Sequence, residues 1–133
     1  MTLFVDTSVW SRAFRDEALL PEIDRLAAAL DAGELVTTTG IVLQELLQGF
    51  TRPSSARRIR EAFDAIPFIE PARSDYVDAA ALRNRCRERG VQVSTIDALL
   101  AQLCIANALT MLSTDIDFDH IARVTSLQVW NPS

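Results

Sequence analysis

Four acidic residues stand where their carboxylates could share one site: Asp6, Glu45, Asp97 and Asp115. Asp6 directly follows the apolar run LFV, and Asp115 follows a second apolar run in the segment MLSTDIDFD. Carboxylates that lie close together repel one another and their pKa values rise, unless a cation neutralises them. Mg²⁺ prefers oxygen ligands and Mn²⁺ accepts the same ones. These residues therefore predict a divalent metal site, and metal-assisted hydrolysis of a phosphodiester by water as its chemistry.

Each of these residues also has a structural explanation, because acidic residues favour helix starts. Asp6 and Asp115 both fit helix N-caps. The segment STID, which ends at Asp97, fits a capping box with Asp in place of Glu. Glu45 falls beside the apolar face of its helix, as an ordinary surface residue would. The two roles need not exclude each other, since a carboxylate in a first helical turn can also face a site there.

Short apolar runs alternate with helical patterns, which predicts one α/β domain over residues 1–133 with three layers and a mostly parallel sheet of about five strands. The expected strands are 3–5, 35–37, 68–69, 111–112 and 127–130. The expected helices are 21–32, 40–50 with Thr39 as its cap, 54–65, 74–89, 95–108 and 118–123. In such a sheet the carboxyl ends of the strands hold the functional residues, which brings Asp6 and Asp115 to one edge.

The composition excludes several classes of function. The chain has 13 basic and 18 acidic residues, for a net charge of -5. All 13 basic residues are Arg, and the lack of Lys excludes a Walker A loop and a Schiff-base enzyme. Cys86, Cys104 and the one His match no zinc pattern, and both thiols are expected in the core. Trp10 is expected there too, with stacking on a base as the alternative. No apolar run reaches the roughly 18 residues of a membrane span, and no signal peptide opens the chain, so we expect a cytoplasmic protein.

Three segments together resemble the PIN domain family, and within it the VapC-type toxin ribonucleases of type II toxin–antitoxin systems. FVDTSVW is similar to the family's opening strand with its first acidic residue, and TTGIVLQELLQG to the helix that carries the second. STIDALLAQLCIANALTMLSTDIDF is similar to the closing block, which is the most specific of the three. The resemblance covers nearly the whole chain. It implies a three-layer α/β/α PIN-like fold and an endoribonuclease that depends on Mg²⁺ or Mn²⁺.

Carried over residue by residue, the family's acidic site falls on Asp6, Glu45, Asp97 and Asp115. The resemblance implies that Asp6 and Asp97 bind the metal most directly, with Asp115 and Asp117 as further ligands. Glu45 and Asp115 would orient the attacking water or hold a second ion. Whether Asp115 or Asp117 is the fourth acid stays open, and so does the choice between one ion and two.

Four further residues are candidates for binding the RNA. The hydroxyl of Ser8 would support the first carboxylate or touch a phosphate, with simple capping as the alternative. Arg85 and Arg89 belong to an arginine tract at the end of a long helix, and they would line the mouth of the site. Arginines at a helix C-terminus also offset the helix dipole without any substrate. Arg12 follows the first motif and completes the set.

The resemblance also implies protein partners and leaves rival functions open. A VapB-type antitoxin would neutralise the toxin by laying its tail over the acidic site, and the toxin would form a homodimer. The main alternative is an inactive or weak PIN domain that acts as a regulatory binding partner. A phosphatase-like enzyme with Asp6 as phosphoryl acceptor ranks last, because Ser8 stands where a second acid is wanted and Lys is absent.

Overall fold

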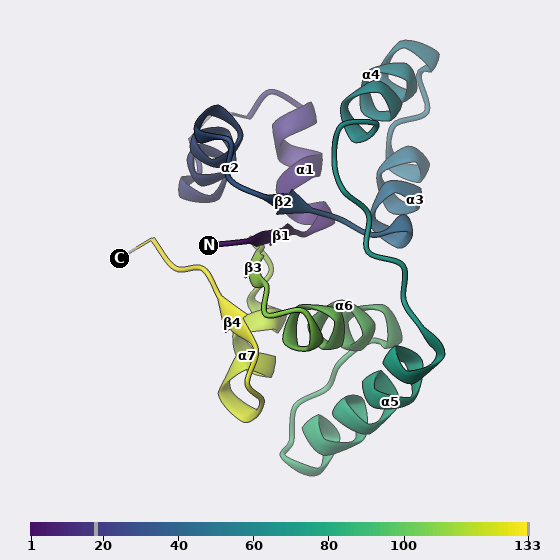
Figure 1. Cartoon of the computed structure of the whole chain (residues 1–133), viewed down its shortest axis with the longest axis vertical. Helices are drawn as coiled ribbons and strands as arrows, with labels where there is room; N and C mark the ends of the chain where they lie inside the picture. The colour runs from purple at the N-terminus through teal and green to yellow at the C-terminus, as the bar shows by residue number, and fades with distance from the viewer. Residues whose placement is uncertain (18, 133) are drawn as a thin grey trace.

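A parallel sheet lies between two groups of helices in the computed structural model, which describes residues 1–17 and 19–132 (Figure 1). The strands are β1 (Leu3–Val5), β2 (Val36–Thr37), β3 (Thr110–Leu112) and β4 (Gln128–Val129). The helices are α1 (Thr7–Phe14), α2 (Pro21–Ala32), α3 (Gly40–Gly49), α4 (Pro53–Phe63), α5 (Arg73–Glu88), α6 (Thr95–Ala106) and α7 (Ile116–Val124).

The strand order β2-β1-β3-β4 makes β1 a central strand, and every neighbouring pair is parallel. The chain leaves β1 toward β2 and then crosses back over β1 to β3. Right-handed crossovers therefore place α1 and α2 on one face of the sheet and α5 and α6 on the other. Figure 1 shows this arrangement, which confirms the three-layer α/β fold. The topological switch point lies between β1 and β3, where such sheets bind their ligands.

The register of β1 and β3 determines which residues meet at that point. All three residues of β1 are fully buried, as a central strand covered on both faces requires. Val5 pairs with Leu112, and the N–H of Asp6 donates to the carbonyl of Leu112 at 2.9 Å. The residues that follow the two strands, Asp6 and Ser113, therefore lie side by side.

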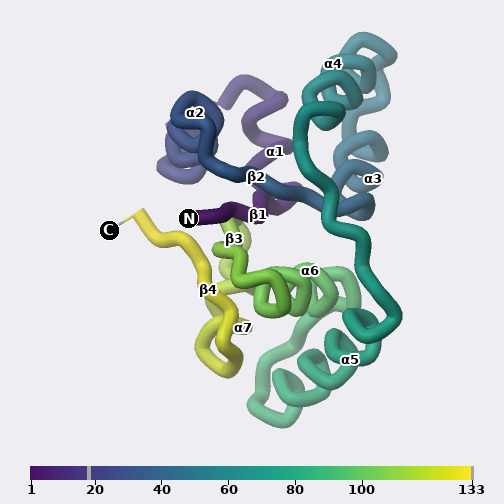
Figure 2. The backbone as a smooth tube through the Cα atoms, in the orientation of Figure 1, coloured from purple at the N-terminus to yellow at the C-terminus, as the bar shows by residue number. Residues whose placement is uncertain are grey.

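The expected fifth strand at 68–69 is reduced to a single parallel bridge between Phe68 and Thr38. Thr38 donates to the carbonyl of Pro67 at 3.0 Å and accepts from Ile69 at 2.8 Å, but Pro67 has no N–H with which to extend the ladder. Thr39 is the N-cap residue of α3 but makes no capping bond with its side chain. Its hydroxyl donates instead to the carbonyl of Ile69 at 2.6 Å. Figure 2 shows this segment, between α4 and α5, passing the end of β2.

Helix α1 has no counterpart among the expected ranges. It is only 8 residues long, and its apolar side chains are too few to give a clear helical period. Trp10 of α1 is 4% exposed, and its ring centroid lies 4.9 Å from that of Phe63 in α4. Phe14 and Phe50 join the same aromatic cluster. Trp10 is therefore a core residue, as expected, and packs α1 against α4.

The two cysteines lie where the composition predicts. Cys86 and Cys104 are buried free thiols, and burial raises the pKa of the Cys104 thiol. Within residues 1–17 and 19–132, no helix combines the length and the apolar character that crossing a membrane requires.

The aromatic cluster yields a first prediction. Nε1 of Trp10 is buried without a hydrogen-bond partner, so Trp10→Phe removes a desolvated donor while a ring remains in place. We expect this variant to change the free energy of unfolding by less than about 1.5 kcal/mol. Phe63→Ala leaves a cavity between α1 and α4, and we expect it to cost about 3–5 kcal/mol. Urea unfolding followed by circular dichroism measures both, and equal losses would contradict this account of the cluster.

Candidate functional site

Three helices begin at the carboxyl end of the sheet, each with an acidic residue at its start. Asp6 is the N-cap of α1, Asp115 is the N-cap of α7, and Asp97 lies in the first turn of α6. The side chains of Asp6 and Asp115 each accept a hydrogen bond from the N–H two residues on, so both residues do cap their helices. A helix N-terminus carries partial positive charge, which stabilises carboxylates and attracts phosphate. Asp6 and Asp115 therefore cap their helices and also lie at the candidate site.

Asp6 is held in place by two serines. Its Oδ2 accepts from the hydroxyl of Ser8 at 2.8 Å and from the hydroxyl of Ser113 at 2.9 Å. The N–H of Ser8 donates to the same oxygen at 3.4 Å. Burial raises the pKa of Asp6, and the hydrogen bonds from Ser8 and Ser113 lower it in part. All three of these bonds reach Oδ2.

The same two hydroxyls join Asp6 to the loop after β3. The N–H of Thr114 donates to Ser8 Oγ at 3.0 Å, and the N–H of Asp115 donates to Ser113 Oγ at 2.9 Å. Each hydroxyl therefore accepts from the backbone and donates to the carboxylate, which fixes the direction of its proton. These contacts favour a supporting role for Ser8. Ser113 was not among the candidates, although the parallel register of β1 and β3 is the signal that would have found it.

Asp97, Asp115 and Asp117 form a tight acidic group. Each offers one carboxylate oxygen, and these oxygens lie within 4.8 Å of one another. Burial, together with the negative charges of Asp6, Asp115 and Asp117, raises the pKa of Asp97 to about 6. The donors are all carboxylate oxygens, which suits Mg²⁺ or Mn²⁺. The residues present therefore fit a divalent cation, and both candidates for the fourth acid belong to the group.

Glu45 lies on α3, outside the group of three aspartates, and it is half-buried. Its Oε1 accepts a hydrogen bond of 2.8 Å from the hydroxyl of Thr7. Thr7 follows Asp6 directly, so this bond holds Glu45 beside the start of α1. The sequence pattern placed Glu45 at the flank of its helix but gave no sign of Thr7, because the contact joins residues 38 positions apart.

The arginines predicted to bind substrate lie at different places. Arg12 is in the last turn of α1, about 9 Å along the axis from its N-cap, and Nη1 of Arg12 lies 3.7 Å from Oε1 of Glu17. Arg85 is exposed on α5. Arg89 lines a hollow that also includes Asp117. The structure thus places Arg89 and Asp117 along the same hollow, and a role in RNA binding stays a prediction for Arg89, Arg12 and Arg85.

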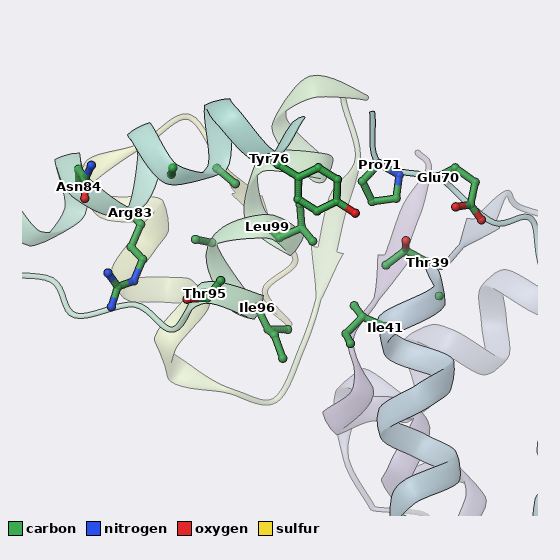
Figure 3. Close-up of a pocket in the computed structure, with 14 residues that line it drawn as sticks. Thr39, Ile41, Glu70, Pro71, Tyr76, Arg83, Asn84, Thr95, Ile96 and Leu99 are labelled. Atoms are coloured by element: carbon green, nitrogen blue, oxygen red, sulfur yellow. The ribbon is translucent and has the colours of Figure 1, made fainter. Parts of the chain in front are cut away.

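A groove of about 590 Å³ opens beside the acidic group, between α5, α6 and the start of α3. Figure 3 shows Tyr76 of α5 and Ile96 of α6 across from Ile41 of α3. Tyr76 is 55% exposed and Ile96 is 37% exposed. Ile96 immediately precedes Asp97 in the first turn of α6, whereas Asp97 itself does not line the groove.

Comparisons with known proteins agree on one family. The model of the PIN domain family matches residues 3–124. The chain is 25% identical over 128 residues to Ribonuclease VapC11 of Mycobacterium tuberculosis, an alignment that covers 95% of this chain and 96% of that protein.

Solved structures show the same fold at lower identity. VapBC2 from Rickettsia felis, bound to a DNA fragment from their promoter, matches with a TM-score of 0.76 and 18% identity over 98% of this chain and 100% of that one. VapC20 of Mycobacterium tuberculosis, described as a Sarcin-Ricin loop cleaving toxin, matches with a TM-score of 0.66 and 20% identity over 95% and 98%.

The raised pKa of Asp97 predicts how stability depends on pH. The pKa rises from 3.8 to about 6, so between these values the folded, metal-free protein holds a proton that the unfolded chain has lost. The stability from this proton is fully present below about pH 4 and is lost as the pH rises through about 6. Because solvent screens this half-buried group, we expect a loss of only about 1 kcal/mol.

Asp97→Asn removes the charge that causes this loss. In EDTA, the melting temperature of the unaltered chain should fall from pH 4 to pH 7 relative to that of the variant. Mg²⁺ added at neutral pH should raise the melting temperature of the unaltered chain more than that of Asp97→Asn, because the cation binds the folded state. Asp31→Asn, an exposed change on α2, is the matched control. Identical pH and Mg²⁺ responses in all three proteins would contradict the assignment.

Proposed function

The chain belongs to the PIN domain family, whose model spans residues 3–124, and from this membership we propose that it is a VapC-type endoribonuclease toxin. It hydrolyses RNA phosphodiester bonds and depends on Mg²⁺ or Mn²⁺. The observation that carries the proposal is the convergence of Asp6, Asp97, Asp115 and Asp117 from three helix starts on the carboxyl ends of β1 and β3. This convergence joins distant parts of the chain, and capping alone does not require it.

The residues of this site divide into ligands and supports. Asp97, Asp115 and Asp117 would hold the ion, together with Oδ1 of Asp6. When bound, such an ion activates water and stabilises the negative charge that develops on the phosphodiester. Ser8 and the serine after β3 keep the Asp6 carboxylate in one orientation through their bonds to Oδ2. The N-terminus of α6 adds partial positive charge for the phosphate of the substrate.

Glu45 takes a different role from the ion-binding aspartates. It stands outside their group, and its single hydrogen bond from Thr7 uses Oε1. Oε2 is therefore the oxygen with which Glu45 orients the attacking water and accepts its proton. Arg89, in the hollow beside Asp117, contacts the RNA backbone.

Two protein partners belong to this proposal. A VapB-type antitoxin covers the acidic site and neutralises the toxin in the cytoplasm. A second copy of the chain packs on the groove beside the site, where Tyr76 and Ile96 expose apolar surface. Contiguous apolar surface of this kind marks protein interfaces. Pairing through the groove would bring both acidic sites to the edge of the same contact, since Ile96 adjoins Asp97.

The nuclease proposal is tested with purified chain and total RNA. We expect cleavage with Mg²⁺ or Mn²⁺ and none with EDTA. Asp6→Asn and Asp97→Asn should each lower the rate at least about 100-fold, because each removes a ligand of the ion. Asp31→Asn should cleave like the unaltered chain. Equal cleavage by all of these proteins, with or without EDTA, would exclude the metal mechanism, whereas a complete lack of cleavage would favour a regulatory binding partner.

The homodimer is tested by light scattering after size-exclusion chromatography. Tyr76→Glu places a charge in the groove, and we expect it to convert a dimer into a monomer, because a buried charge without a partner is costly. Val77→Glu is the matched control, since Val77 is 64% exposed on the same helix and does not line the groove. A monomeric unaltered chain, or a dimer that survives Tyr76→Glu, would contradict this interface.

A further inference from the structure

A hollow of about 610 Å³ lies next to the acidic group, between the loop after α5 and the outer face of α7. Arg89, the C-cap residue of α5, lines it from one side. His120 and Arg123 of α7 line it from the other, and Asp117 of the same helix is also part of the lining. Gln92, in the loop after α5, also lines the hollow. Two cations and an imidazole from different elements thus surround one space that opens onto a candidate metal ligand.

The lining residues of α7 form a row. Asp117, His120 and Arg123 are spaced three apart, so they share one face of the helix. Along this face the charge changes from negative at the acidic group to positive at the far end of the hollow. With a rise of about 1.5 Å per residue, Arg123 lies about 9 Å along the axis from Asp117. The row therefore leads outward from the site where cleavage would occur.

Arg89 and Arg123 have no acidic partner in the part of the chain that the structure describes. The ion pairs found there join Arg12 with Glu17, Arg25 with Glu34 and Arg58 with Asp16. Each of the two unpaired arginines stands at a helix C-terminus, where it offsets the dipole. The dipole effect does not require that both arginines line one hollow, and two like charges on one hollow repel each other.

We propose that this hollow binds a backbone phosphate of the RNA next to the phosphate that is cleaved, with Arg89, His120 and Arg123 as its ligands. The proposal rests on the nuclease function above and adds His120 and Arg123 to it. The guanidinium group offers paired donors that match phosphate oxygens. A net charge of -5 does not oppose this, because the local potential governs binding at a site. The hollow thereby fixes which way the RNA strand leaves the acidic group.

The test measures the affinity for a labelled single-stranded RNA by fluorescence anisotropy. All proteins are full length and carry Asp97→Asn, so that the RNA is not cleaved. Arg89→Gln and Arg123→Gln should each weaken binding about 5–10-fold at low salt and reduce the slope of log affinity against log salt by about 0.7. His120→Ala should weaken binding about threefold with the slope unchanged, since it loses a hydrogen bond rather than a fixed charge. Arg57→Gln, an exposed change on α4, is the matched control.

A double variant of Arg89 and Arg123 with the affinity and salt slope of the Arg57→Gln control would overturn the proposal. So would a double variant that binds RNA normally but loses an acidic peptide or the antitoxin, because the hollow would then serve a protein. Melting temperatures of all the variants confirm that they fold. Hydrolysis of bis(p-nitrophenyl) phosphate by the unaltered chain with Mn²⁺ reports on the acidic site alone. Failure of the nuclease function is thus seen separately from failure of the hollow to bind RNA.

Discussion

The repulsion between carboxylates at the carboxyl ends of β1 and β3 is the constraint on which the rest of the site depends. Burial raises the pKa of Asp6, and burial together with the negative charges of neighbouring acids raises the pKa of Asp97 to about 6. The fold makes this crowding tolerable by means other than a basic side chain. Three helix N-termini point their partial positive charge at the same place, and two serine hydroxyls donate to Asp6. The divalent cation proposed for this site would neutralise the charge that remains.

The sheet is small, but its register is enough to set Asp6 and Ser113 side by side. Strand β2 has 2 residues and β3 has 3, yet the pairing of Val5 with Leu112 is enough to bring Asp6 against Ser113. The segment around Phe68 and Ile69, which passes the end of β2, is joined to the sheet by one bridge and by the hydroxyl of Thr39. The pairing of β1 with β3 therefore sets the positions of the site residues, while the outer parts of the sheet are held by few bonds.

Local patterns were enough to predict the positions of Asp6, Asp97 and Asp115, because capping and strand ends leave a signature within a few residues. The α/β class of the fold could be predicted as well, because each strand and helix pattern is visible within a short stretch of sequence. The bond from Thr7 to Glu45 and the place of Ser113 depend on contacts between distant residues, which no local pattern contains. Only the start of helix α1 was considered, through Asp6 as its cap, and its range was not predicted because the helix is short and follows its strand almost at once. The fifth strand was overestimated because Pro67 interrupts the ladder.

The contacts of Asp6 also have a consequence for how the protein is made. The hydroxyls of Ser8 and Ser113 lie 3.2 Å apart but are separated by 105 positions in the sequence. Contacts of such long range form only after the intervening chain is available to close the loop. A ribosome must therefore synthesise the chain well beyond β3 before the first carboxylate gains its supports. Incomplete chains therefore lack the assembled acidic site.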